Sequence, residues 1–310
     1  LLLIGTQAGF TFSGLKDFMA SGRELAHAEL IGALLIAGFG TLISLFPFHS
    51  WAAPAYASAP APVAMMHAGV LKKFGLYGLF MFQPLMETGF LPWTNILLVL
   101  LVCNVIWVGY VTVNQKRLDL LLGNSSVMHM GYIFLAFAAL VVSGSAEANP
   151  WALKGAALLM LAHGLTIALL FLLCGQIEKQ TGTLEINSLG GLSTRLPRMA
   201  FVFGLAGMAS IGLPGLANFP GEFMVFFSGF AGFSNGFGPV QIATILCLWG
   251  LVIGAVYMLR AYRNIFQGDL SKASAYATGL QPSERAANCF LVIALAVFGF
   301  FPTLVLQFFS

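Results

Sequence analysis

Three charged side chains stand inside long uncharged stretches, where a charge has to be accommodated without bulk water: Lys72, Lys73 and Glu222. A charge at the centre of a bilayer costs about 2.5–3.5 kcal/mol on insertion scales, so such a residue normally faces the interior of a helix bundle and has a function there. A lysine near a helix end can instead snorkel to the interface. Lys72 and Lys73 stand about ten residues, roughly 15 Å, from either end of the segment 62–82. The pattern predicts a functional lysine. Because adjacent helical positions point about 100° apart, one of the two should face a conduction path and the other a neighbouring helix or a water pocket.

Histidines occur in three of the apolar segments: His67, His129 and His163. Histidine suits proton relay because its unperturbed pKa lies near neutral. A lone histidine in an apolar helix is more often a satisfied packing residue. Three of them on separate helices, in a chain that also carries an intramembrane lysine and glutamate, favour a relay.

The sequence offers no pattern for a metal or a redox centre in this chain. The four cysteines, Cys103, Cys174, Cys247 and Cys289, occur singly in different apolar segments, without the spacing of a cluster, zinc site or redox dithiol. We therefore expect them to be small buried residues. Ligation of b-type haem would need facing pairs of histidines. A membrane electron carrier remains an alternative that a colourless purified protein would exclude, and a purely structural scaffold is another.

Composition shows what must position these residues. The 310 residues are 59% hydrophobic and 8% charged, whereas about a quarter of the residues of a soluble protein are charged. Uncharged stretches of the roughly 18 residues needed to cross a bilayer recur along the chain. With the charged segment 62–82 and a long stretch divided at 232–239, they predict nine membrane helices: 31–48, 62–82, 94–113, 120–142, 155–175, 199–217, 223–231, 239–259 and 286–309. We expect an all-α, polytopic transmembrane helical bundle, preceded by a short apolar segment at 1–12.

Two of the predicted helices look interrupted. Pro60 and Pro62 precede the helix that carries Lys73, and a second group precedes Glu222, comprising Pro214, Gly215, Pro220 and Gly221. Paired broken helices in two halves indicate a transporter site, because loosened backbone near the midplane can hold ions and water. They predict two discontinuous helices in inverted repeats.

The two termini and the distribution of charge bear on domain organisation and on orientation in the membrane. The sequence starts at Leu1 without a methionine and ends on hydrophobic residues, which is typical of a piece of a longer protein, and we treat 1–310 as a single transmembrane domain. The net charge of +3 is too small to indicate nucleic-acid binding. Counted over the nine helices, Lys and Arg divide almost evenly between alternate loops, so the positive-inside rule does not fix the orientation.

An ordered set of motifs resembles one family. The matching stretches are PFHSW at 47–51, APAP at 59–62, HAGVLKK at 67–73, SSVMHMGY at 125–132, LAHG at 161–164, LGGL at 189–192, GLPG at 212–215 and NFPGEF at 218–223. In this order and spacing they resemble the antiporter-like subunits of respiratory complex I, most closely the M type of bacterial NADH-quinone oxidoreductase. The chain departs from the family after Trp51, where AAPAY at 52–56 lacks the usual acid and histidine.

The resemblance implies roles for individual positions. Lys73 would be the central lysine of the first discontinuous helix, and Glu222 the carboxylate of the second. His163 would be the relay histidine between them, and His129 a polar group nearby. Lys72 matches no functional position of the family and is kept as an auxiliary candidate.

The resemblance also implies an activity and an assembly. It implies a proton-translocating membrane-arm subunit that works in the bacterial inner membrane with other membrane-arm subunits. NADH, FMN, iron-sulfur clusters and quinone would belong to those partner subunits, and no cofactor or metal is expected in this chain. A cation/proton antiporter subunit and the membrane arm of a membrane-bound hydrogenase remain alternatives within the same family.

Overall fold

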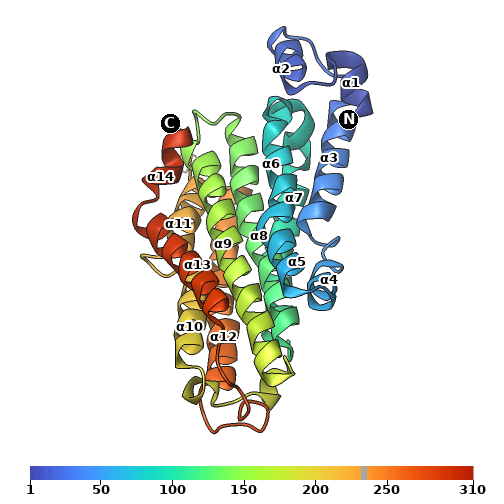
Figure 1. The fold of residues 1–310 in the computed structure, drawn as a ribbon. Coiled ribbons are helices and arrows are strands. Elements are labelled where there is room, and N and C mark those ends of the chain that lie inside the picture. The colour runs from blue at the N-terminus through green and yellow to red at the C-terminus, as the bar shows by residue number, and fades with distance from the viewer. Residues whose placement is uncertain (232–235, 310) are drawn as a thin grey trace.

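The computed structural model describes residues 1–231 and 236–309, which form a helical bundle (Figure 1). No strand occurs in these residues, and only an isolated bridge joins Arg117 to Glu185. The principal helices are α1 (Leu2–Ala8), α2 (Phe12–Ala20), α3 (Ala28–Ile43), α4 (Ala52–Ser58), α5 (Ala61–Met66), α6 (Lys72–Met81), α7 (Thr94–Val113), α8 (Leu118–Ser143), α9 (Pro150–Thr181), α10 (Pro197–Ser210), α11 (Asn218–Ser228), α12 (Pro239–Phe266), α13 (Pro282–Phe300) and α14 (Thr303–Leu306).

Within residues 1–231 and 236–309, five helical stretches are long and apolar enough to cross a membrane: Gln83–Val113, Leu118–Ser143, Pro150–Thr181, Pro239–Phe266 and Pro282–Phe300. A further apolar helix, α3, is shorter. The π-helical turn η1 (His67–Leu71) joins α5 to α6, so that the segment expected at 62–82 is helical from Ala61 to Met81. The expectation of an all-α membrane bundle is therefore confirmed. The inverted-repeat relation stays a prediction.

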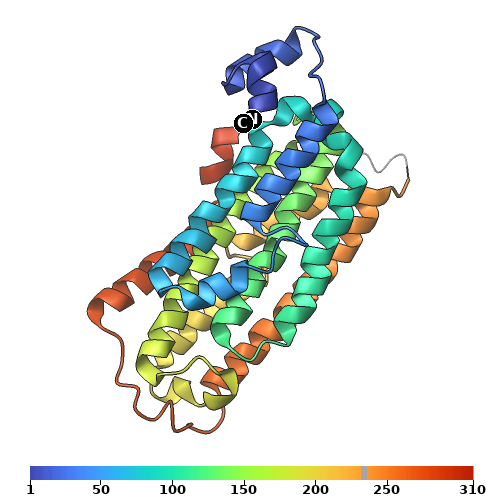
Figure 2. The same ribbon diagram turned by 90° about the vertical axis from the view of Figure 1, so that its right-hand side faces the viewer.

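A proline accounts for one difference from the expected helix boundaries. The segment 286–309 ends early, because Pro302 stands two residues after Phe300, the last residue of α13, and the chain resumes as the short helix α14. Of the cluster expected at 232–239 to divide a long segment, residues 232–235 lie outside the described residues, and α12 begins at Pro239 as expected. The apolar start at 1–12 forms α1 and the first residue of α2, and these two helices project from one end of the bundle (Figure 2).

The sixth and seventh expected helices, 199–217 and 223–231, do not each cross the membrane as the sequence predicted. The helices α10 and α11 follow one another along the bundle as two halves of a single interrupted span (Figure 1). Counting each half as a full crossing inverts the side assigned to every later loop. The structure places Arg260 beside Gln115, with a bond of 2.9 Å to its carbonyl, and Lys179 beside Glu284 at 2.8 Å.

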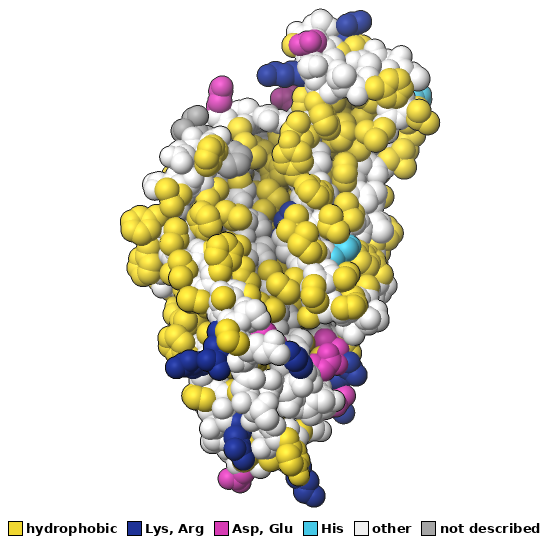
Figure 3. Space-filling model, in the orientation of Figure 1, with side chains coloured by type: hydrophobic (Ala, Val, Ile, Leu, Met, Phe, Trp, Pro, Cys, Tyr) yellow, Lys and Arg dark blue, Asp and Glu magenta, His cyan; other side chains and the backbone are white. Residues whose placement is uncertain are grey.

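The basic residues therefore gather at one end of the molecule, which we call the basic end. Its members, whose segments are joined by hydrogen bonds and an ion pair, are Lys116, Arg117, Lys179, Arg195, Arg198, Arg260, Arg263, Lys272 and Arg285. Lys16, Arg23 and Lys154 lie toward the opposite end. The even division expected from the sequence is thus wrong. Figure 3 shows charged side chains at the two ends and a broad belt of hydrophobic side chains between them.

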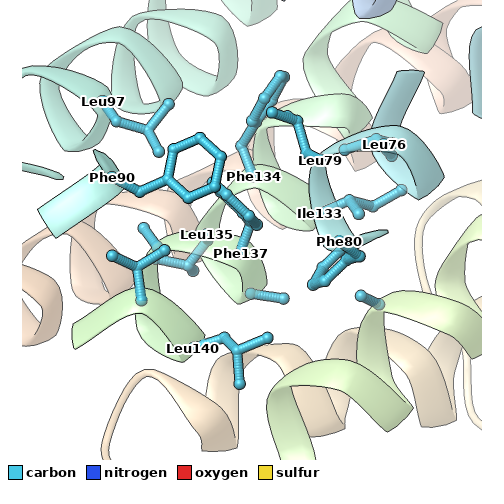
Figure 4. Close-up of a cluster of buried hydrophobic side chains, with 14 of the residues drawn as sticks. Leu76, Leu79, Phe80, Phe90, Leu97, Ile133, Phe134, Leu135, Phe137 and Leu140 are labelled. Atoms are coloured by element: carbon cyan, nitrogen blue, oxygen red, sulfur yellow. The ribbon is translucent and has the colours of Figure 1, made fainter. Parts of the chain in front are cut away.

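The helix α8 forms the centre of the bundle. Within its most apolar window 94% of the residues are buried, against 11% for α13. A helix that is hydrophobic on all sides is expected to be surrounded by other helices. Phe137 of α8 makes edge-on contacts with Phe80 and Phe90, at centroid distances of 5.5 and 5.2 Å, within the cluster drawn in Figure 4. This packing fixes α6 against α8 on the side of the bundle that carries the two lysines.

Candidate functional site

Lys73 is the second residue of α6, just after the π-helical turn η1, which is the only interruption of the first expected broken helix between Ala61 and Met81. Its side chain is 8% exposed. The Nζ atom donates to the carbonyl oxygen of Ala68 and lies 2.9 Å from Nδ1 of His163. A π-helical turn widens the backbone spiral, and such turns are frequent at functional sites. Here it places an ammonium or amine group against a histidine of α9, inside the bundle.

A pair of glycines makes this contact possible. Gly69 of η1 faces Gly164 of α9, and a Cβ atom on Gly164 would lie 2.6 Å from the carbonyl oxygen of Gly69. Real Cβ atoms do not approach a backbone so closely, so any larger residue would push the two helices apart. Small residues allow close backbone approach between membrane helices. The glycines therefore set the distance between Lys73 and His163.

His129 continues the row of buried ionisable groups. It is 2% exposed, and its ring centroid lies 5.4 Å from that of His163. Its Nδ1 atom is 2.8 Å from the carbonyl oxygen of Ser125, one turn back on α8. Its Nε2 atom is 2.9 Å from the carbonyl oxygen of Ser210, the last residue of α10. His129 thus bridges the central helix and the end of the second broken helix.

The second break follows Ser210 and carries Glu222 on its far side. The chain leaves the helix at 211–217, with Gly212 and Gly215 at φ values of 78° and 91°. Those values favour glycine because it has no Cβ atom. Glu222 lies in the first turns of α11, is 3% exposed, and packs its carboxylate against Gly212.

The sequence placed Pro220 and Gly221 in this break, and that is wrong: both lie inside α11. Pro220 is tolerated because the first turn of a helix does not need its N–H groups. Gly221 packs on the backbone of α9, where a Cβ atom would lie 2.8 Å from the nitrogen of Leu159. Gly221 is therefore a packing residue between α9 and α11. Pro60 and Pro62 flank the start of α5 as expected, and Pro214 and Gly215 lie in the break itself.

Lys72 and His67 lie together on another side of α6 and η1, away from the contact between Lys73 and His163. Lys72 is fully buried, and its Nζ atom lies 5.8 Å from the ring centroid of Tyr56 in α4. His67 is half-buried, and its Nδ1 atom lies 3.3 Å from the hydroxyl of the same tyrosine. The expectation that the adjacent lysines face different surroundings therefore agrees with the geometry. The sequence did not indicate that Tyr56 would receive both Lys72 and His67.

Several buried polar atoms near these residues make no hydrogen bond within the described part of the chain. They are Lys72 Nζ, Ser126 Oγ, Tyr132 OH, Asn218 Nδ2 and Glu222 Oε1. Most buried polar groups in proteins are paired with protein or with ordered water. These atoms therefore mark the parts of the interior where internal water would find partners.

Two tyrosines of the site were missed by sequence reasoning. Tyr132 is fully buried, and its ring lies 5.6 Å from that of His129 in an edge-on contact. Tyr257 of α12 exchanges a hydrogen bond of 2.7 Å with Ser125. A buried tyrosine normally finds a partner for its hydroxyl. The signal that could have found them is a tyrosine in an otherwise apolar segment, at the spacing of one turn from His129 in the case of Tyr132.

Metal-ligating side chains do not gather in the described part of the chain. No group of three or more His, Cys, Asp or Glu residues there could hold a metal ion. The four cysteines are free, and Cys174 and Cys247 are buried, whereas Cys289 is exposed on α13. The expected burial is therefore wrong for Cys289, because α13 lies at the edge of the bundle, and only partly met for Cys103, which is half-buried.

Known proteins are similar in sequence to this chain over nearly its whole length. The chain is 36% identical over 299 residues to an NAD(P)H-quinone oxidoreductase chain 4 of Synechococcus elongatus, a match that covers 95% of this chain and 53% of that protein. It is 31% identical over 318 residues to the corresponding protein of Synechococcus sp. strain JA-2-3B'a(2-13), covering 99% and 58%. The chain therefore spans somewhat more than half the length of these relatives.

Solved structures share the fold. A chain of respiratory complex I from Thermus thermophilus, solved with bound NADH, superimposes with a TM-score of 0.85 at 26% identity, covering 99% of this chain and 62% of that one. The membrane-bound sulfane sulfur reductase, an archaeal respiratory membrane complex, gives 0.83 at 23% identity, covering 96% and 49%. The Mrp complex of Dietzia sp. gives 0.82 at 19% identity, covering 99% and 62%. The last two likenesses show the fold alone.

A family model matches the region that holds every residue of the site except Tyr257. It is described as NADH:quinone oxidoreductase/Mrp antiporter, TM, and it matches residues 1–247. That range contains both broken helices, the two adjacent lysines, the buried histidines and Glu222. The family expected from the motifs is thereby confirmed, and this chain belongs to the NADH:quinone oxidoreductase/Mrp antiporter transmembrane family.

Proposed function

We propose that this chain is the proton-translocating part of a membrane-arm subunit in a complex I-like NADH-quinone oxidoreductase. Its relay would run from Lys73 through His163 and His129 to Glu222. The observation that carries the proposal is the distance of 2.9 Å between Lys73 Nζ and His163 Nδ1, in an interior where both side chains are less than a tenth exposed. A buried lysine in hydrogen-bond contact with a histidine can pass a proton directly, whereas a lysine that only anchors a helix would reach for the interface.

The remaining steps are supported by the order of groups in space. His129 follows His163 at a ring distance of 5.4 Å. Beyond His129, the hydroxyl of Tyr132 and a carboxylate oxygen of Glu222 both lack a partner within the described residues. Internal water bound to such atoms would carry the proton across the gap to Glu222. The second break would provide the loosened backbone that a hydrated path through a membrane needs.

The energy for pumping would come from outside this chain. Each proton moved against 100 mV of membrane potential costs about 2.3 kcal/mol. The relatives named NAD(P)H-quinone oxidoreductase favour partner subunits that hold NADH, FMN, iron-sulfur clusters and quinone. We accordingly place the chain among other membrane-arm subunits, in the bacterial inner membrane, with redox chemistry driving a change in the affinity of Lys73 for its proton.

Replacement of Lys73 by alanine tests the proposal. The assembled complex carrying Lys73→Ala, reconstituted into vesicles, should reduce quinone while acidification of the vesicle interior falls to about the level of passive leak. Lys16→Ala is the matched control, because Lys16 is exposed at the end of the bundle. Full acidification by the Lys73→Ala complex would reject the relay.

The family description, which also names the Mrp antiporter, favours one alternative, a cation/proton antiporter subunit. The same vesicles discriminate between the two. Acidification that depends on sodium at a fixed rate of electron transfer supports the antiporter, whereas acidification that is independent of sodium supports the proton pump. A membrane-bound hydrogenase arm would instead be driven by hydrogen oxidation in its parent complex.

A further inference from the structure

His129 occupies a setting that a neutral imidazole cannot satisfy. Both of its ring nitrogens face backbone carbonyl oxygens, at 2.8 Å for Ser125 and 2.9 Å for Ser210. A carbonyl oxygen only accepts hydrogen bonds. Neutral imidazole carries one N–H and one lone pair, so one of the two contacts would set a lone pair against a lone pair. Only the doubly protonated ring donates to both oxygens.

The carbonyl of Ser210 is available because of a proline. In a continuous helix this oxygen would accept the N–H of the residue four positions on. That residue is Pro214, which has no N–H. The neighbouring carbonyls of this end of α10 are taken by the chain itself: Gly207 accepts from Ile211, Met208 from Leu213, and Ala209 from Gly212. The break therefore leaves the Ser210 carbonyl to the side chain of His129.

We propose that His129 is held as an imidazolium and stores the transported proton, and that the end of α10 at the break is its receptor. The carbonyl end of a helix carries a partial negative charge that favours a cation, and α10 is a helix of 14 residues that ends at Ser210. The second broken helix thus has a task of its own: it binds a charged histidine through backbone atoms. This inference deepens the proposed relay and rests on it only in calling the stored proton the transported one.

Ionisable groups on four neighbouring elements surround His129, and some of them oppose a positive charge on its ring. Lys72 and Lys73 on α6 repel an imidazolium electrostatically, and His163 on α9 lies between Lys73 and His129. Tyr132 on α8 and Tyr257 on α12 are the neighbouring phenols, and Glu222 on α11 lies across the break. Because like charges oppose each other, the imidazolium of His129 is the resting form and favours the neutral amine at Lys73. His129 is neutral only between the release of its proton and the arrival of the next one from Lys73, which His163 passes on by accepting at one nitrogen as it releases from the other.

Nitrogen-15 NMR of the histidine-labelled complex in bilayers tests the charge state directly. Doubly protonated rings give a signal distinct from that of neutral rings. At pH 8.5, where free histidine is neutral, we expect a doubly protonated signal in the wild-type complex. It should be absent in His129→Gln and retained in the control His67→Gln. A His129→Gln difference spectrum that instead shows one protonated and one bare nitrogen would overturn the inference.

A second variant keeps His129 in place, so the inference can be tested even if the His129→Gln complex does not assemble. Pro214→Ala supplies an N–H that competes for the Ser210 carbonyl. The pH at which the His129 ring loses its second proton should fall by about one unit, the equivalent of one net hydrogen bond. An unchanged midpoint would count against the receptor. If His129 is neutral while pumping still depends on Lys73, this inference is overturned and the proposed relay stands. If His129 is an imidazolium while pumping does not depend on Lys73, only the proposed relay is overturned.

Discussion

Lys72 and Lys73 are neighbours in the sequence, but their amino groups lie in different surroundings. The Lys73 group has two partners, the Ala68 carbonyl and His163, whereas the Lys72 group has only the face of the Tyr56 ring. A cation over an aromatic ring gains at most a few kcal/mol when it is desolvated. Lys72 therefore acts on its neighbour chiefly as a charge, and its proton competes with the one on Lys73.

This competition predicts a shift in the pH dependence of transport. In Lys72→Met the positive charge beside Lys73 is gone, so Lys73 should keep its proton to higher pH. An interaction of roughly 1–2 kcal/mol at an effective dielectric constant near 20 corresponds to about one pH unit. The alkaline limb of the acidification rate should therefore move up by about that amount. Tyr56→Phe keeps the ring and removes only the hydroxyl, and it should leave this limb in place. An unmoved limb in Lys72→Met would show that the two lysines titrate independently.

At the scale of the helices, close packing at glycine positions sets the geometry of the site. Gly69 and Gly164 bring η1 onto α9, and Gly221 brings α11 onto the other side of α9. The helix α9 is thereby held between the two broken helices, and His163 lies between its two contact points, next to Gly164 and one turn after Leu159. A shift of one of these backbones alters the length of the Lys73–His163 contact.

Gly164→Ala tests that dependence. The added Cβ atom would lie 2.6 Å from a backbone oxygen, so α9 and η1 must separate. Overpacking of this kind costs about 1–3 kcal/mol of stability, and a misplacement near 1 Å lowers transfer rates by up to about a hundredfold. Acidification should fall by about ten- to a hundredfold, with a lower melting temperature in detergent. Gly38→Ala is the matched control, because a Cβ atom on Gly38 meets nothing within 4 Å. Equal transport in the two variants would contradict the role assigned to Gly164.

The sequence predicted which residues are buried and which helices carry them better than it predicted their contacts. Lys73, His163 and Glu222 were selected because a charge or an imidazole in an apolar segment is costly. Their partners escaped prediction because they are backbone atoms: the Ala68 and Ser210 carbonyls leave no trace in residue type. Tyr132 was missed for another reason, since a tyrosine in a membrane helix is ordinarily a packing or interfacial residue.

Across the whole molecule, the distribution of charge fixes an orientation that the sequence left open. The interrupted span of α10 and α11 brings the later loops to the basic end, so that Lys116, Lys179, Arg263 and Lys272 lie on one side. Short loops rich in Lys and Arg stay in the cytoplasm. The basic end is therefore expected to face the cytoplasm, and the end with α1 and α2 the outside.

Cysteine labelling checks this orientation. In a variant without the four native cysteines, Lys272→Cys should react with a membrane-impermeant maleimide in inside-out vesicles and not in intact spheroplasts. Lys16→Cys should show the opposite pattern and serves as the matched control. Labelling of Lys272→Cys from the outside would invert the assignment.

The interruption between Ser210 and Asn218 also bears on how the chain enters the membrane. The helix α10 has 14 residues and α11 has 11, and neither approaches the roughly 20 needed to cross the hydrocarbon alone. During synthesis each half would be a poor substrate for the insertion machinery. Both halves must therefore enter the bilayer together, packed first against α9 and then against α12. Each of those two helices is long and apolar enough to insert by itself. The span that carries Glu222 thus depends on its neighbours to enter the membrane.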